Sequence, residues 1–410
     1  MEAAFTTATL WLGLALAATV LANRLRISIA LVEIMVGVLA SFLISQGFGP
    51  DAMGADLPWL KFIAGTGAIL LTFLAGAELD QASLRAKWKE VWIVGLVGFL
   101  APFLGCAAIA RYLIGWDVRA SLLAGVALST TSMAVVYAVM LEYGFNKTEF
   151  GKGILGACFI NDLGTVIVLG LLFAPFTFKT ALFIVACVTA CVFLPLLTRK
   201  LTAWYGNRTA AIRTKWILFV LFGLGALALW SGSEAVLPAY VAGMVLADTL
   251  GRDPSYVRRL RTLTIGFLTP FYFLRAGSLV ALPALGEAPL VFLLLFAGKV
   301  VSKVFGLYPV ISGFRRDQKE RWYYTLLMST GLTFGTISAL YGLSHGIVTR
   351  SQYSLLVAAV IGSAVIPTLI ANFIFLPRHL LAAAEEPDRF PDRTATRRIA
   401  QPSEGRDHVP

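Results

Sequence analysis

Long apolar runs separated by short polar loops dominate the hydropathy pattern of the chain. Each run approaches the roughly 20 residues that a helix needs to cross a bilayer. The alternation of polar and apolar residues that a membrane β-strand needs is absent. The pattern predicts an all-α polytopic membrane protein with about 13 transmembrane helices. The predicted spans are Ala4–Ala22, Ile27–Ser45, Leu60–Leu79, Val91–Ile114, Ala120–Leu141, Gly151–Phe173, Thr180–Thr198, Trp216–Trp230, Val236–Ala247, Leu263–Leu282, Leu290–Ser312, Tyr323–Gly342 and Tyr353–Leu376.

Two of these predicted helices are interrupted by polar residues. The fifth span carries the run STTS at 129–132, and the twelfth carries STGLT at 329–333. If the first six and the last six spans are two halves, both interruptions fall at the fifth position of their half. The odd seventh span between the halves makes the repeat inverted. Interrupted helices at matching positions are the sequence sign of a secondary transporter's binding site. We therefore predict an inverted repeat with two broken, crossing helices.

Charge gives the orientation of the spans. Only 14% of the residues are charged, which is too few to cover a soluble protein of this length. With the N-terminus outside, the cytoplasmic loops hold twenty Lys and Arg residues and the external loops hold five. This bias predicts a multi-pass protein of the cell (inner) membrane with an external N-terminus and a cytoplasmic C-terminus. The net charge of +11 lies in these loops, so it does not indicate a nucleic-acid partner.

The chain divides into a membrane part and a tail. Residues 1–382 are expected to form the transmembrane domain, and the first apolar run is expected to be a retained helix because no basic region precedes it. Residues 383–410 are polar and rich in Arg and Pro, which predicts a disordered cytoplasmic tail. No soluble regulatory domain is expected in the chain, so such a function would need a separate subunit.

Asp162 is a carboxylate within the apolar run of the sixth span, in the sequence FINDLGT. A charge at that depth costs at least about 2.5–3.5 kcal/mol, so a residue of this kind normally has a partner or a function. One interpretation is a structural carboxylate that is protonated or paired. The interpretation we favour is a site where a proton and a monovalent cation compete.

Polar neighbours of Asp162 are candidates for the same site. Asn161 offers a carbonyl oxygen and an amide without charge, either to an ion or to a neighbouring helix. Thr130, Thr131 and Ser132 lie in the first interruption, where unwound carbonyls can face a cation. Their alternative role is ordinary packing of small residues between helices.

Three basic residues remain inside the predicted spans. Lys299 and Lys303 are one turn apart on the eleventh span and share a face. Both lysines are expected to compensate charge at the site. Lys303 lies deeper and is the one we favour, whereas Lys299 lies nearer the outside, where the alternative is that it snorkels. Arg275 is expected to form a structural ion pair rather than to contact substrate. Its candidate partners are Glu33, Glu78 and Glu234.

Enzyme chemistry is not indicated by the sequence. No nucleophile–base pair, phosphate-binding loop or Cys/His metal spacing is found, and the three His residues are scattered. We expect no enzyme activity, no cofactor and no metal beyond a transported monovalent cation.

Six stretches of the chain, in order, resemble the monovalent cation/proton antiporter superfamily, and especially its Kef-related branch. They are IALVEIMVGVLAS at 29–41, FLAGAELD at 73–80, LSTTSMAVV at 128–136, FINDLGT at 159–165, PFYFLRAGSLV at 270–280 and SKVFG at 302–306. The resemblance implies a thirteen-helix homodimer with a dimerisation domain and a core domain that moves as an elevator. It also implies that Asp162 carries the cation and the proton, with Thr131 and Asn161 nearby and Lys303 opposite.

The chain departs from the family's patterns at three positions. Electrogenic members have two adjacent aspartates, where this chain has Asn161 and Asp162. Electroneutral members with an Asn-Asp pair have a glutamate where this chain has Leu155, and an arginine where it has Lys303. A single carboxylate makes one-for-one exchange the simpler expectation.

Three functions follow as hypotheses. The first is a secondary antiporter that exchanges Na⁺, K⁺ or Li⁺ for H⁺. The second is an ion-coupled organic anion transporter on the same inverted-repeat fold, in which Lys303 and Arg275 bind the anion. The third is a membrane sensor that binds ions without transporting them.

Overall fold

The computed structural model describes residues 2–25, 29–49, 52–77, 87–145, 148–173, 177–205, 211–233, 235–251 and 253–381, and every regular element in these segments is helical. Ten of these helices are long and apolar enough to cross a membrane. The three other predicted spans correspond to shorter helices, namely α6 with α7, α11 and α13. The all-α membrane fold is therefore confirmed, whereas the number of crossings stays a prediction. The predicted tail lies outside the described residues.

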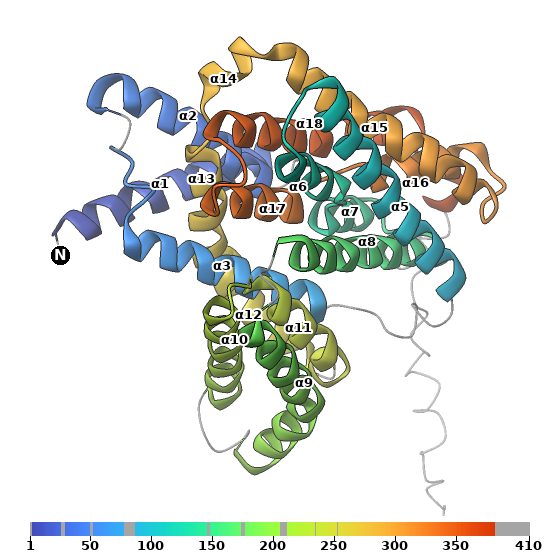
Figure 1. The fold of residues 1–410 in the computed structure, drawn as a ribbon. Coiled ribbons are helices and arrows are strands. Elements are labelled where there is room, and N and C mark those ends of the chain that lie inside the picture. Colours follow the sequence, from blue (N-terminus) through green and yellow to red (C-terminus); the bar gives the residue numbers. More distant parts are fainter. Residues whose placement is uncertain are drawn as a thin grey trace, which may run out of the picture.

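One set of helices, which we call the scaffold group, is built around α3 and α11. In Figure 1, α9, α10, α11 and α12 lie below α3, while α1, α2 and α13 lie on its other side. Its members are α1 (Glu2–Leu25), α2 (Ile29–Phe48), α3 (Pro58–Ala77), α9 (Phe178–Tyr205), α10 (Ile212–Trp230), α11 (Val236–Gly251), α12 (Pro254–Leu263), the π-helical segment η3 (Thr264–Leu268) and α13 (Thr269–Ser278).

A second set, which we call the crossing group, contains both interrupted helices (Figure 1). Its members are α5 (Trp88–Ala108), η1 (Ile109–Leu113), α6 (Val118–Ser129), α7 (Met133–Glu142), α8 (Glu149–Phe173), α15 (Pro289–Ser312), α16 (Gln318–Met328), α17 (Thr333–Ser344) and α18 (Arg350–Ile374). Helix α14 (Leu282–Glu287) connects α13 to α15, and η4 (Arg378–Leu380) follows α18. Helix α8, which carries Asp162, packs against α5, α6 and α7 of its own group and meets α11 of the scaffold group.

Glycines allow the backbones of α3 and α11 to touch. A Cβ atom at Gly76 would lie 2.4 Å from the carbonyl oxygen of Tyr240, and one at Gly243 would lie 2.1 Å from that of Phe73. Contacts this close exclude any larger residue unless the helices separate. Small residues at such interfaces hold membrane helices together by van der Waals packing. Helix α11 is therefore firmly fixed to the scaffold group.

One segment that the sequence analysis treated as a basic loop is helical. Helix α12 begins after Asp253, whose side chain accepts a hydrogen bond from the amide of Tyr256. Asp followed by Pro is a typical start of a helix. Asp253 also pairs with Arg213 at 2.6 Å. Hydrogen bonds from Ser255 and then Arg213 lower the pKa of Asp253 to about 2. Because this segment is rich in arginine, it was expected to be a loop, and the Asp-Pro start of a helix was not recognised.

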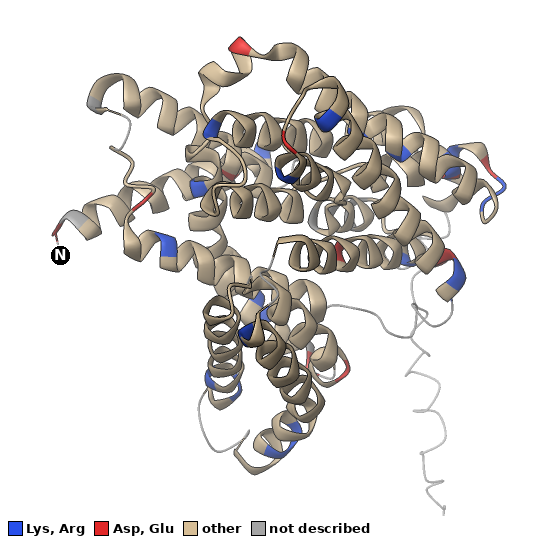
Figure 2. Cartoon of the chain, in the orientation of Figure 1, with Lys and Arg blue, Asp and Glu red and all other residues tan. Residues whose placement is uncertain are grey.

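Charged residues lie mostly toward helix ends and in connections, and most of the chain is uncharged (Figure 2). A largely buried ion pair, between Glu90 of α5 and Arg315 of the α15–α16 connection, lies near the starts of α5 and α8. Glu90 is 8% exposed, and its Oε1 lies 2.6 Å from Nη2 of Arg315. The guanidinium lies over the ring of Phe150, 5.2 Å from its centroid. This pair ties the start of α8 to α5 and to the α15–α16 connection.

We predict that Glu90→Gln destabilises the fold. The substitution leaves the largely buried Arg315 without a counter-charge, and losing one partner of such a pair costs about 3 kcal/mol. Thermal unfolding of the purified protein in detergent measures the effect as a fall in Tm. The matched control is Asp248→Asn, because Asp248 pairs with Arg199 at 3.3 Å while both side chains are about half exposed. Equal Tm values for the two variants would contradict the prediction.

Candidate functional site

The two interrupted helices meet at their breaks. The first break separates α6, which ends at Ser129, from α7, and the second separates α16, which ends at Met328, from α17. The amide of Ser132 donates to the carbonyl oxygen of Thr330 at 3.0 Å. The hydroxyl of Thr131 donates to the carbonyl oxygen of Met328 at 2.8 Å. The predicted crossing of two broken helices is therefore present, and each break supplies hydrogen-bond partners to the other.

Asn161 of α8 bridges the first break. Its Oδ1 accepts a hydrogen bond from the amide of Thr131 at 2.9 Å, and its Nδ2 donates to the carbonyl oxygen of Ser129 at 3.3 Å. One amide side chain thus satisfies backbone groups from both sides of the interruption. Oδ1 of Asn161, a candidate ligand for an ion in the sequence analysis, therefore already accepts a hydrogen bond from Thr131.

Both buried lysines of α15 also bond to the first break. Nζ of Lys303 donates to Oγ1 of Thr131 at 2.9 Å, and Nζ of Lys299 donates to the carbonyl oxygen of Thr130 at 3.2 Å. Neither side chain is exposed. The alternative that Lys299 snorkels to the surface is therefore wrong. The reason is that the unwound end of α6 offers carbonyl groups without helical partners, which attract a cation.

The position of Lys299 explains why residue 331, in the second break, is a glycine. A Cβ atom at Gly331 would lie only 2.0 Å from Nζ of Lys299 and 3.1 Å from Oγ1 of Thr130. A larger residue would displace the ammonium group from the crossing. Lys299 therefore lies where the two breaks meet, and it contacts both.

Asp162 lies beside this network and is 1% exposed. Its Oδ1 is buried and has no hydrogen-bond partner among the described residues. Thr165, one turn later, donates to the carbonyl oxygen of Asn161 at 3.1 Å and so is engaged with its own helix. The hydroxyl of Thr130 likewise donates to Ala127 of its own helix at 3.2 Å. A buried carboxylate oxygen without a donor can take a proton or a cation.

Arg275 has a different partner from those that the sequence analysis named. Its Nε donates to the carbonyl oxygen of Ala55 at 2.8 Å, and its Nη2 lies 3.4 Å from Asp56. Asp56 also pairs with Lys61 at 2.9 Å. The hydrogen bond from Lys61, and then the charges of Lys61 and Arg275, hold the pKa of Asp56 below its usual value.

Arg275 thus forms a structural ion pair, as expected, but its partner is the loop residue Asp56. Glu33 is buried in α2 and does not pair with Arg275. Glu78 and Glu234 lie outside the described residues. Sequence spacing could not identify Asp56, because the connection between α2 and α3 folds back onto α13.

No group of three or more His, Cys, Asp or Glu side chains that could hold a metal ion occurs in the described segments. The site thus has one carboxylate, two ammonium groups and a set of hydroxyl and amide groups that hold the breaks. This set suits a single, weakly held monovalent ion better than a tightly chelated metal.

Tyr240 of α11 is a neighbour of the site that the sequence analysis did not identify. Its ring lies 5.4 Å from that of Phe159, one turn before Asp162. In the sequence it is one aromatic residue within an apolar run, so only the packing of α11 on α8 reveals it.

We predict that Asn161→Ala destabilises the protein by about 1–3 kcal/mol, because it leaves the amide of Thr131 and the carbonyl of Ser129 without partners. Asn161→Asp keeps an acceptor for Thr131 and is expected to lose less. Thr165→Val removes only a bond within α8 and serves as the control. Thermal unfolding in detergent provides the measurement. If Asn161→Ala is as stable as Thr165→Val, the bridge does not hold the break.

The comparisons of this chain with known proteins all indicate the same family. A family model described as "Sodium/hydrogen exchanger, transmembrane" matches residues 12–376. A relative named "Probable Na(+)/H(+) antiporter 3", from Methanocaldococcus jannaschii, is 26% identical over 357 residues, which cover 83% of this chain and 90% of the relative. A relative named "Na(+)/H(+) antiporter", from Enterococcus hirae, is 25% identical over 377 residues, which cover 86% and 93%.

A solved structure has the same fold. The sodium/proton antiporter MjNhaP1 from M. jannaschii, determined at pH 8, superposes with a TM-score of 0.67 over 93% of this chain and 98% of that chain. The two sequences are 15% identical, so the likeness extends to the fold alone.

Proposed function

Because the chain belongs to the transmembrane sodium/hydrogen exchanger family, we propose that it exchanges Na⁺, K⁺ or Li⁺ for H⁺ by alternating access, with Asp162 as the shared site. The family is one of transporters rather than enzymes, and cation/proton exchange is the activity in the names of the relatives described above. The assignment of the site and of the mechanism is ours.

The observation that carries the proposal is the buried Oδ1 of Asp162, which has no hydrogen-bond partner in the part of the chain that the structure describes and lies beside the crossing of two broken helices. An ionised carboxylate there is costly unless a cation neutralises it, and a protonated one is neutral. The two occupied forms exclude each other, because both need the same carboxylate. When the cation-bound form of the carboxylate moves across the membrane in one direction and the protonated form moves in the other, the result is cation/proton exchange.

The groups around Asp162 have supporting roles in this proposal. Lys303 provides positive charge near the carboxylate when the site is empty, and Thr131 joins Lys303 to the break that Asn161 bridges. Lys299 compensates the carbonyl end of α6. Thr130 and Ser132 hold unwound backbone, and any contact they make to the ion is through main-chain carbonyl oxygens.

Organic anion transport is not favoured. That hypothesis needs Arg275 and Lys303 to bind the substrate together. Instead, the guanidinium of Arg275 is engaged with Ala55 and Asp56 of the loop before α3, whereas Lys303 is engaged with Thr131. The names of the relatives also describe cation/proton antiporters.

The setting of the exchanger is part of the proposal. The distribution of basic residues supports an external N-terminus and a cytoplasmic C-terminus in the cell membrane. Extensive packing within each helix group, and the narrower contact between α8 and α11, support a fixed scaffold domain and a moving core domain. The homodimer is proposed from the resemblance to the antiporter superfamily alone. If a separate subunit regulates the exchanger, adding that subunit changes the exchange rate. Cross-linking in native membranes tests the dimer, and protease access to a C-terminal tag tests the orientation.

We predict that Asp162→Asn abolishes exchange, because an amide can neither bind a proton nor balance a cation. Everted vesicles with a ΔpH-reporting dye are challenged with Na⁺, K⁺ and Li⁺ in turn, which also identifies the cation. Asp248→Asn, an exposed carboxylate outside the site, is the control and is expected to behave as wild type. Full activity of Asp162→Asn would remove Asp162 from the site.

We predict one-for-one, electroneutral exchange, because one carboxylate serves both ions and, among the described residues, Lys303 and Lys299 bond to Thr131 and Thr130 rather than to a second acid. In proteoliposomes of purified protein, clamping the membrane potential at different values should leave the rate of cation-driven H⁺ movement unchanged. A rate that rises or falls with the clamped potential would mean that a second charge moves, with Lys303 the group to test next.

A further inference from the structure

Tyr240 of α11 lies between two aromatic residues of the crossing group. Its ring stacks on Phe159 of α8 at 5.4 Å and 24°, and meets Phe334 of α17 edge-on at 5.6 Å and 82°. Its hydroxyl donates to the carbonyl oxygen of Phe159 at 3.3 Å. The side chain has no exposed surface.

These contacts join the two helix groups. Tyr240 is fixed to the scaffold group, because its own carbonyl oxygen lies against Gly76 of α3. Phe159 belongs to α8, the helix that carries Asp162, and Phe334 is the second residue of α17, the helix that follows the second break. One scaffold side chain therefore contacts both elements that form the site.

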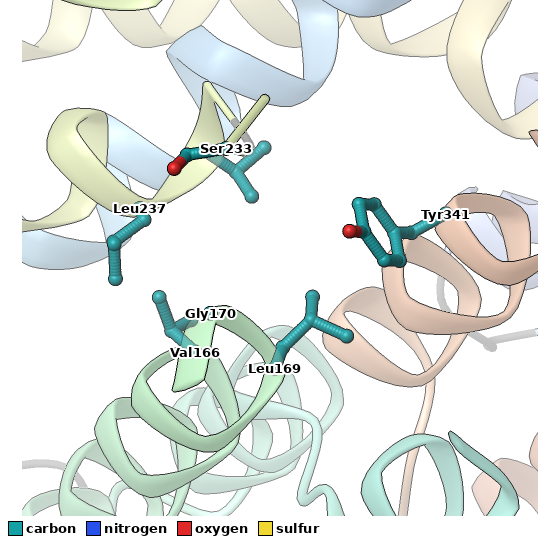
Figure 3. A pocket seen from close by; sticks show the side chains of 7 residues that line it. Val166, Leu169, Gly170, Ser233, Leu237 and Tyr341 are labelled. Atoms are coloured by element: carbon teal, nitrogen blue, oxygen red, sulfur yellow. The ribbon is translucent and has the colours of Figure 1, made fainter. Parts of the chain in front are cut away.

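Tyr240 also lies on one side of Asp162 along α8. Phe159 precedes Asp162 by three residues, so the two side chains share a face of the helix. Past Asp162, the same boundary between the groups holds a cavity of about 10 Å³, close to the space that one water molecule requires. Figure 3 shows Val166 and Leu169 of α8, Leu237 of α11 and Tyr341 of α17 around this cavity. The boundary thus holds the packed rings of Tyr240, Phe159 and Phe334 before Asp162 and a water-sized cavity after it.

We propose that Tyr240 is a latch that closes one side of Asp162 and must release Phe159 and Phe334 before the carboxylate can be reached from that side. This inference rests on the proposed exchange function. With the orientation predicted from the basic loops, α8 begins at the cytoplasmic face, so the latch closes the cytoplasmic side. The ring excludes water and ions, and the hydroxyl holds the ring against α8.

The two parts of the side chain have separable roles. The hydrogen bond stabilises the closed arrangement and is lost when the groups separate, so it slows each cycle. The ring fills the boundary, so it prevents ions from crossing without movement of the core. A smaller side chain at this position would leave a passage beside Asp162.

Tyr240→Phe tests the hydrogen bond. It keeps the ring, and it is expected to raise the exchange rate by about fivefold, the rate equivalent of one neutral hydrogen bond, with the apparent KM for the cation little changed. The matched control is Tyr324→Phe, because Tyr324 is also fully buried and donates to a carbonyl of α8, that of Gly153, at 3.1 Å, yet lies within the crossing group. A merely structural role would lower the Tm of both variants and accelerate neither.

Tyr240→Ala tests the ring. It is expected to admit protons without added cation, so that an imposed ΔpH decays in cation-free proteoliposomes, while Tyr240→Phe stays tight. Wild-type rates in Tyr240→Phe, or no leak in a folded Tyr240→Ala, would overturn the latch. If Tyr240→Ala fails to fold, the rate of Tyr240→Phe still decides. Wild-type protein and Asp162→Asn in the same preparation separate the two ideas, because absence of exchange by the wild type would instead contradict the proposed function.

Discussion

Unwound backbone inside a membrane must find hydrogen-bond partners within the protein, and this requirement organises the centre of the molecule. The first break leaves main-chain groups at Ser129, Thr130 and Thr131 without helical partners. Asn161 takes two of them and Lys299 takes the third. Because these side chains are already engaged, Oδ1 of Asp162, which has no hydrogen-bond partner among the described residues, is the atom that we propose takes the ion. The way in which the breaks are partnered therefore supports Asp162 as the proposed ion site.

Much of this arrangement was predictable, because polar and charged residues stand out within the apolar helices of a membrane protein. A charge or a polar run within an apolar helix is visible without a structure, and Asp162, Lys303 and the two interruptions were all found in this way. The crossing followed from their matching positions in the two halves. The identity of hydrogen-bond partners did not follow. The direction of Lys299 depends on the distance between α15 and the end of α6, which no spacing in the sequence determines.

Residues in connections were the least predictable. Asp56, Arg315 and Asp253 all make ion pairs with residues far away in the sequence or at helix starts, and each lies in or beside a loop that appeared simply polar. A polar loop residue carries no sign of its partner, because solvation explains it equally well. Sequence reasoning therefore located the membrane interior of this protein better than it located the contacts that hold the helix ends.

Packing is closer within each helix group than it is between α8, which carries Asp162, and α11 of the other group. Helices α3 and α11 touch through glycines, and α8 is joined to its own group by Asn161 and at its start by the Glu90–Arg315 pair. Across the boundary, α8 meets α11 through fewer contacts, chief among them the ring and hydroxyl of Tyr240. A carboxylate held rigidly by one body and covered by another changes its access when the bodies separate, without any change in its own bonds. In the mechanism that we propose, the narrow contact between α8 and α11 lets a small set of contacts control the exposure of Asp162, which extensive packing of α8 on α11 would prevent.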